Sequence, residues 1–101
     1  MLHIESVEQF DELIKNETVL MDFSATWCGP CRMLAPILEE IEEEKSFNGL
    51  IRKVDVDDFG EIAARFGIQA VPTLLLFKGG KLVNSAAGYM PKDELLNFLN
   101  N

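Results

Sequence analysis

The alternation of apolar and polar positions divides the chain into segments of strand length and of helix length. Residues 18–24 are apolar on both faces, which is typical of a central strand covered by helices on both sides. Two later stretches place apolar residues at i, i+3, i+4 and i+7, the spacing of one helix face. These positions are Leu34, Ile37, Leu38 and Ile41 in the first stretch, and Phe59, Ile62, Ala63 and Phe66 in the second.

Turn and capping signals place the remaining elements. Ser6 and Gln9 have the spacing of a capping box, so we expect a helix to begin at Val7, after a short strand at residues 2–4. We expect Asn48-Gly49 to end the second helix, before a strand at residues 50–56. Gly79-Gly80 predicts a hairpin between strands at residues 73–77 and 81–86. The last helix is expected to have Pro91 at its first position.

These elements follow one another in the order βαβαβαββα. Right-handed crossovers would pair the first three strands in parallel, and the hairpin would add an antiparallel pair. We therefore predict an α/β fold, a mixed five-stranded sheet with helices on both faces. The chain has 101 residues, which indicates a single domain spanning residues 1–101.

Composition and charge narrow the possible functions. Hydrophobic residues make up 48% of the sequence, as in a globular protein. The formal net charge of -8 argues against binding to nucleic acid and to anionic membrane surfaces, since both are themselves negative. No stretch has the length of a membrane span or the pattern of an export signal. We therefore expect a cytoplasmic protein without a membrane partner.

The two cysteines, Cys28 and Cys31, lie where the strand at residues 18–24 gives way to the next helix. Two cysteines at this spacing can close a small disulfide ring or share a metal ion. Unpaired N–H groups and a partial positive charge at a helix N-terminus favour thiolate over thiol. We therefore interpret Cys28 as an exposed nucleophile and Cys31 as the more shielded partner that closes the ring. A zinc site would need further ligands, and the one histidine, His3, is interpreted as a surface or strand-edge residue.

Asp22 is the one acidic residue within the apolar run of residues 18–24. A carboxylate there is far from water and needs a reason. It is either a hydrogen-bonded structural residue or a proton carrier for the cysteines, and we favour the second. Burial should raise its pKa. Lys53 is similarly unusual within the third strand, and one interpretation is a lysine that points outward from the strand.

The segment Trp27-Cys28-Gly29-Pro30-Cys31 resembles the active site of the thioredoxin family. Several other segments also match that family, and the resemblance covers nearly the whole chain. They are Asp22-Phe23, Ala35-Pro36-Ile37-Leu38, Lys53-Val54-Asp55, Val71-Pro72-Thr73-Leu74 and Gly79-Gly80. The resemblance implies a thioredoxin-like fold and the reduction of protein disulfides by dithiol–disulfide exchange.

The resemblance also implies roles for individual residues and partners. Lys53 would lie near Asp22 and bias its protonation, and Pro72 would have a cis peptide bond and face the disulfide. The substrate would be a disulfide-containing protein, and a separate reductase would re-reduce the cysteines. The redox group would be the Cys28–Cys31 disulfide itself, with no other cofactor and no metal, in a monomer. The expected substrate-binding surface comprises Trp27, Gly29, Pro30, Val71, Pro72, Ala87 and Gly88.

One position departs from the family pattern, and two other functions remain open. Many thioredoxins carry an aromatic residue at the position of Ser24, so this serine leaves open the fine tuning of the redox potential and the substrate preference, but not the reaction class. A disulfide oxidase or isomerase is disfavoured by Gly29-Pro30 between the cysteines, where such enzymes often have histidine. The alternative that we retain is a non-enzymatic subunit or regulator that uses the same fold to bind a partner.

Overall fold

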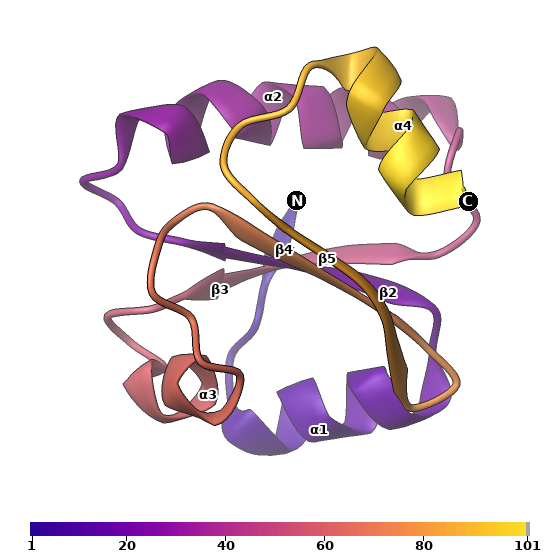
Figure 1. The fold of residues 1–101 in the computed structure, drawn as a ribbon. Coiled ribbons are helices and arrows are strands. Elements are labelled where there is room, and N and C mark those ends of the chain that lie inside the picture. Colours follow the sequence, from indigo (N-terminus) through magenta and orange to yellow (C-terminus); the bar gives the residue numbers. More distant parts are fainter. Residues whose placement is uncertain (101) are drawn as a thin grey trace.

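A computed structural model describes residues 1–100 and shows a five-stranded sheet between two layers of helices (Figure 1). The strands are β1 (Leu2–His3), β2 (Val19–Ser24), β3 (Leu50–Asp55), β4 (Thr73–Lys78) and β5 (Lys81–Ala87). The helices are α1 (Val7–Asn16), α2 (Gly29–Glu44), α3 (Gly60–Arg65) and α4 (Lys92–Asn100). The predicted element order and α/β class are confirmed.

The sheet has the strand order β1-β3-β2-β4-β5. β3 runs parallel to both β1 and β2, whereas β4 runs antiparallel to both β2 and β5. The mixed sheet is thus as predicted, with β2 at its centre. Because β4 runs opposite to β2, the beginning of β4 lies beside the end of β2, and Thr73 pairs with Phe23.

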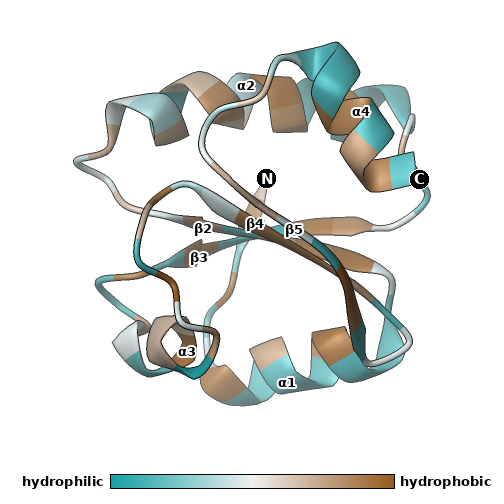
Figure 2. Cartoon of the chain, in the orientation of Figure 1, coloured by the Kyte–Doolittle hydropathy of each residue, from teal (hydrophilic) through white to brown (hydrophobic). Residues whose placement is uncertain are grey.

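Each face of the sheet has its own hydrophobic core, as the two helical layers in Figure 1 suggest. α2 and α4 cover one face, where Leu20 packs with Leu34, Leu38 and Leu95. α1 and α3 cover the other, where four phenylalanines pack edge to face or tilted. They are Phe10, Phe23, Phe66 and Phe77. Figure 2 shows hydrophobic and hydrophilic residues alternating along the helices, as expected of helices that cover a sheet.

The ends of three helices test the capping predictions. α1 begins at Val7 as expected, and the Ser6 hydroxyl accepts a hydrogen bond from the Gln9 amide at 3.0 Å. α2 ends at Glu44 rather than at Asn48-Gly49, because Lys45 adopts a left-handed conformation with φ of 57°. α4 begins at Lys92, one residue after the expected Pro91.

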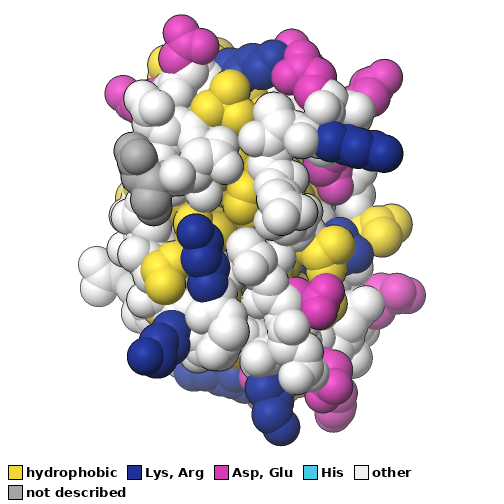
Figure 3. All heavy atoms as spheres, turned by 90° about the vertical axis from the view of Figure 1, so that its right-hand side faces the viewer, with side chains coloured by type: hydrophobic (Ala, Val, Ile, Leu, Met, Phe, Trp, Pro, Cys, Tyr) yellow, Lys and Arg dark blue, Asp and Glu magenta, His cyan; other side chains and the backbone are white. Residues whose placement is uncertain are grey.

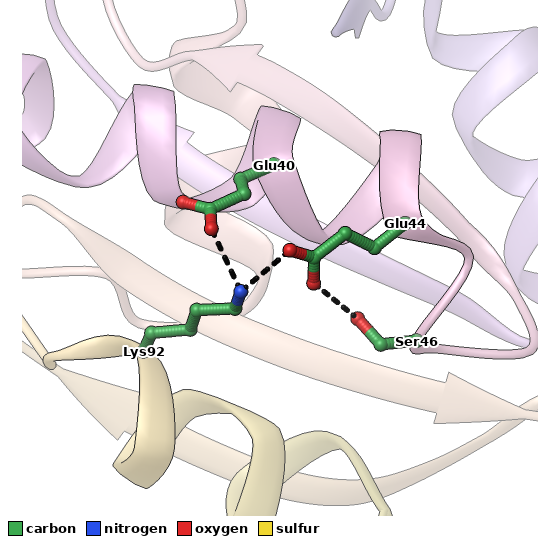
Figure 4. Close-up of polar contacts among 4 residues, drawn as sticks. All are labelled: Glu40, Glu44, Ser46 and Lys92. Atoms are coloured by element: carbon green, nitrogen blue, oxygen red, sulfur yellow. Dashed lines mark hydrogen bonds and ion pairs between the residues drawn. The ribbon is translucent and has the colours of Figure 1, made fainter.

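Ion pairs join the two helices on the α2 face. The Lys92 amine donates hydrogen bonds of 2.8 Å to both Glu40 and Glu44, so it ties the start of α4 to the last turns of α2 (Figure 4). These pairs raise the pKa of Lys92 and lower that of Glu44. Figure 3 shows the end of the molecule that lies away from the cysteines. On that face, charged side chains of both signs are scattered between hydrophobic ones.

Candidate functional site

The two cysteines lie at the end of β2, where the chain turns into α2. Cys28 is the N-cap of the helix and Cys31 belongs to its first turn. Their Cα atoms are 5.3 Å apart and a disulfide joins them. The i, i+3 spacing makes this possible, because residues three apart lie on the same side of a helical turn.

One backbone amide in the first turn of α2 points at the Cys28 sulfur. The Cys31 amide donates a hydrogen bond to Cys28 Sγ at 3.2 Å. No acidic residue lies in the first turn of α2, so no side chain there offsets the partial positive charge of the helix N-terminus. Both effects stabilise a negative sulfur at position 28 when the disulfide is open, and they act less on Cys31.

The prediction that Cys28 is exposed is wrong for the disulfide form. The exposed fraction is 4% for Cys28 and 2% for Cys31, so both are buried. Ala25, Val56 and Val71 pack around the pair. These residues come from three separate segments of the chain, and their convergence covers a sulfur that local sequence alone would leave open.

Trp27 stands beside the disulfide as an exposed aromatic side chain, 67% accessible. Its indole Nε1 donates a hydrogen bond of 3.0 Å to Asp57, which follows the end of β3. Asp57 was not among the residues that the sequence singled out. The carboxyl ends of the parallel strands β2 and β3 meet at one edge of the sheet, and this rule could have drawn attention to it.

The segment before β4 faces the disulfide from the other side. The Val71 carbonyl oxygen lies 3.6 Å from Cys28 Sγ, and the Val71–Pro72 peptide bond is cis, as the family resemblance implied. The Pro72 carbonyl accepts a hydrogen bond from the Gly88 amide at 2.8 Å, which holds the end of β5 next to this segment. Gly88 has a φ of 96°, a conformation that favours glycine.

The residues expected to form the substrate-binding surface are thus placed around one end of the sheet. Trp27, Pro30 and Ala87 are exposed, and Gly29, Val71 and Gly88 are half-buried; only Pro72 is buried. The sequence missed an apolar hollow of about 170 Å³ next to Trp27. The hollow is lined by Trp27, Val56, Ala63, Ile68, Gln69, Ala70 and Val71.

Asp22 lies on the central strand, fully buried. Neither of its carboxylate oxygens has a hydrogen-bond partner within residues 1–100. Burial raises its pKa from 3.8 to about 6, and the nearby positive charge of Lys53 opposes that rise. The direction and the two causes of this pKa shift are those that the sequence predicted.

Lys53 is the neighbour of Asp22 across the parallel β2–β3 ladder and is half-buried.

Within residues 1–100 no group of three or more His, Cys, Asp or Glu side chains could hold a metal ion. None of the helices in the same part of the chain is long and apolar enough to cross a membrane.

Comparison with known proteins identifies related chains. The family model described as Thioredoxin matches residues 1–101. A thioredoxin of Chlamydia caviae is 45% identical over 99% of this chain and 97% of its own length. A thioredoxin of Listeria monocytogenes is 48% identical over 90% of this chain and 88% of its own length. The structure of a mutant thioredoxin from Halobacterium salinarum superimposes with a TM-score of 0.88 and 35% identity, covering 97% of this chain and 86% of that one.

Proposed function

The chain belongs to the thioredoxin family and is a thiol–disulfide oxidoreductase acting on protein disulfides, and we propose that Cys28 attacks the substrate and Cys31 resolves the product. The observation that carries this order is the N-cap position of Cys28, whose sulfur accepts the Cys31 amide at 3.2 Å. The sulfur that is better stabilised as a thiolate is the one prepared to attack.

The reaction proceeds in two exchanges. The Cys28 thiolate attacks one sulfur of the substrate disulfide, a Cys28–substrate bond forms, and the other substrate sulfur leaves as a thiolate that takes up a proton. Cys31 then gives up its proton and attacks Cys28 Sγ. The Cys28–Cys31 disulfide forms and the second substrate sulfur leaves as a thiolate, which takes up a proton from solvent, so the substrate gains the two electrons that the cysteines lose.

Asp22 is the proposed proton acceptor for Cys31. A carboxylate with a pKa of about 6 is largely ionised at neutral pH, yet its basicity is closer to that of a thiol than the basicity of an ordinary aspartate. Lys53, its partner across the ladder, is proposed to keep enough of the carboxylate ionised to accept the proton.

The substrate is proposed to lie across Trp27, Gly29, Pro30, Val71, Pro72, Ala87 and Gly88. An extended segment of the substrate passing Val71 would bring its disulfide to Cys28. We propose that the chain works as a single-domain monomer in the cytoplasm, with its own disulfide as the redox group. A separate reductase would restore the dithiol.

A turnover assay tests this function. The chain, at catalytic concentration, should accelerate the reduction of a disulfide-linked test protein by dithiothreitol, and Cys28→Ser should remove that acceleration. A parent protein that gives no acceleration would contradict the proposal and would leave a binding subunit as the better interpretation.

A further inference from the structure

A second hollow lies beside Cys31, on the α2 face of the sheet. It has a volume of about 250 Å³. We call it the Ser24 hollow, and it is lined by His3, Ser24, Ala25, Thr26, Cys31, Arg32, Lys53 and Asp55. It shares no lining residue with the hollow next to Trp27.

The Ser24 hollow reaches Cys31, one of the two groups between which the proton moves, and the ladder partner of the other, Asp22. Cys31 forms part of its wall, although only 2% of Cys31 is exposed. Lys53, the ladder partner of Asp22, forms another part. Asp22 and Ser24 lie two residues apart on β2 and so project from the same face of the sheet.

The proton that Asp22 accepts from Cys31 needs a path to solvent. Asp22 is fully buried and its oxygens have no partner within residues 1–100, so a proton accepted there has no hydrogen-bonded chain of described side chains to the surface. The protein must release that proton before the next cycle. The Ser24 hollow opens beside Cys31 and beside Lys53, the ladder partner of Asp22.

We propose that the Ser24 hollow is the route by which the proton exchanged between Cys31 and Asp22 reaches solvent, and that the small Ser24 side chain keeps this route open. The inference rests on the proposed roles of Cys31 and Asp22. An aromatic side chain at this position, as in many members of the family, would occupy the space that the serine leaves. Ser24 is a positioning residue here, since it shapes the route without taking part in the exchange.

The charged groups around the hollow decide which bases can enter it. Lys53 and Asp55 come from β3, Arg32 from α2 and His3 from β1. Arg32 also donates a hydrogen bond of 2.8 Å to the Thr26 carbonyl, which fixes its guanidinium at this edge. Two permanent cations face a single carboxylate, so the hollow should repel cationic acids and admit small neutral bases.

Chemical rescue provides the test. The reduced protein is mixed with a limiting amount of a nitrobenzoate disulfide, whose coloured thiolate is released once when Cys28 attacks and again when Cys31 resolves. In Asp22→Asn we expect the second phase to be slowed by roughly 100-fold, at the low end for loss of a positioned base. Imidazole should then accelerate that phase by about tenfold or more, whereas a bulky trimethylpyridine of similar basicity should not.

The matched variants place the rescue in the hollow. The double variant Asp22→Asn/Ser24→Ala keeps the hollow and should keep the acceleration by imidazole. In the double variant Asp22→Asn/Ser24→Phe that acceleration should fall to less than about twofold. A first phase of equal rate with alanine and with phenylalanine at position 24 shows that Ser24→Phe leaves Cys28 and the fold intact. Equal rescue by imidazole with alanine and with phenylalanine at position 24 would overturn the proposal.

A second measurement does not depend on Asp22. If the second phase in Asp22→Asn is as fast as in the parent, the proposed role of Asp22 is wrong. Alkylation of Cys31 in Cys28→Ser then tests whether the Ser24 hollow connects Cys31 to solvent. Iodoacetamide should alkylate Cys31 there about tenfold faster than in Cys28→Ser with Ser24→Phe, since reactivity follows access and thiolate character. Equal rates would show that the hollow does not lead to Cys31.

Discussion

Asp22 lies opposite Lys53 in the parallel ladder between β2 and β3, and the charge of Lys53 counteracts the effect of burial on the Asp22 pKa. The carboxylate is fully buried, whereas the lysine is half-buried and lines the Ser24 hollow. The pair thus joins the interior of the sheet to its accessible edge. The first two predictions concern this pair.

Asp22→Asn should stabilise the fold at neutral pH. The folded pKa of about 6 lies above the unfolded value of 3.8, so the native state holds a proton that the unfolded chain has already released. The resulting cost begins above about pH 4, grows until about pH 6 and is then constant at about 3 kcal/mol. Denaturant melts of both proteins from about pH 3 to about pH 8 should show no difference at the acid end and the full difference above about pH 7. Equal stability at neutral pH would contradict the raised pKa.

Lys53→Met should raise the Asp22 pKa further, because it removes the one cause that lowers it. The acid limb of the pH–rate profile for disulfide reduction should therefore move to higher pH, and stability at neutral pH should fall. Lys53→Arg keeps the charge and serves as the control. Combining Lys53→Met with Asp22→Asn should remove the shift, and a shift that persists in the double variant would have to come from another group.

The two cysteines should differ in what they trap. Cys31→Ser leaves the attacking sulfur without its resolving partner, so mixed disulfides with substrate proteins should accumulate. Cys28→Ser should accumulate none, and both variants should lose turnover. Non-reducing gels after incubation with a disulfide-linked protein distinguish the two. Trapping by Cys28→Ser instead would reverse the assigned order of attack.

Trp27→Ala should weaken the use of protein substrates without weakening the fold. The side chain is 67% exposed, so the free energy of unfolding should change by less than about 0.5 kcal/mol. Loss of its contact area should lower kcat/KM for a protein disulfide by roughly tenfold, as for other central aromatic contacts. Asp57→Ala, which removes only the hydrogen bond to the indole, should have a smaller effect in the same direction. A small disulfide, for which the indole offers little contact, is the reference substrate.

Lys92→Met should loosen the attachment of α4 to α2, because it removes both ion pairs of the Lys92 amine (Figure 4). The loss of stability should be small and should shrink in high salt, since the pairs are solvent-exposed. The Glu44 pKa is lowered in the folded protein, so its contribution is present at neutral pH and is lost as the pH falls through that lowered value. A double-mutant cycle with Glu44→Gln measures the coupling, and additive effects would show that the pair contributes nothing.

Most of the fold could be predicted because its signals are local. The spacing of Ser6 and Gln9 located the start of α1, and Gly79-Gly80 located the hairpin. The end of α2 was missed because Lys45 takes a left-handed conformation that is uncommon without glycine. No local pattern distinguishes this lysine from others in a charged helix end.

The site shows the same division between local and distant causes. The helix-terminal position of Cys28 and the raised pKa of Asp22 follow from residues close by in sequence, and both were predicted. The burial of Cys28 depends on Val56 and Val71, and the orientation of Trp27 depends on Asp57. Such contacts arise only when the strands pair, so the cysteine motif by itself could not have predicted them.

The antiparallel pairing of β4 with β2 also sets when the site comes into existence during synthesis. A nascent chain that has emerged only as far as β3 already carries Cys28 and Cys31, but not the segment before β4 that contributes Val71 and Pro72. On the ribosome, the two thiols therefore precede the structure that encloses them. The segment with Val71 and Pro72 reaches Cys28 only after β4 has been made and has paired with β2. Until then the two cysteines are ordinary thiols on an incomplete chain.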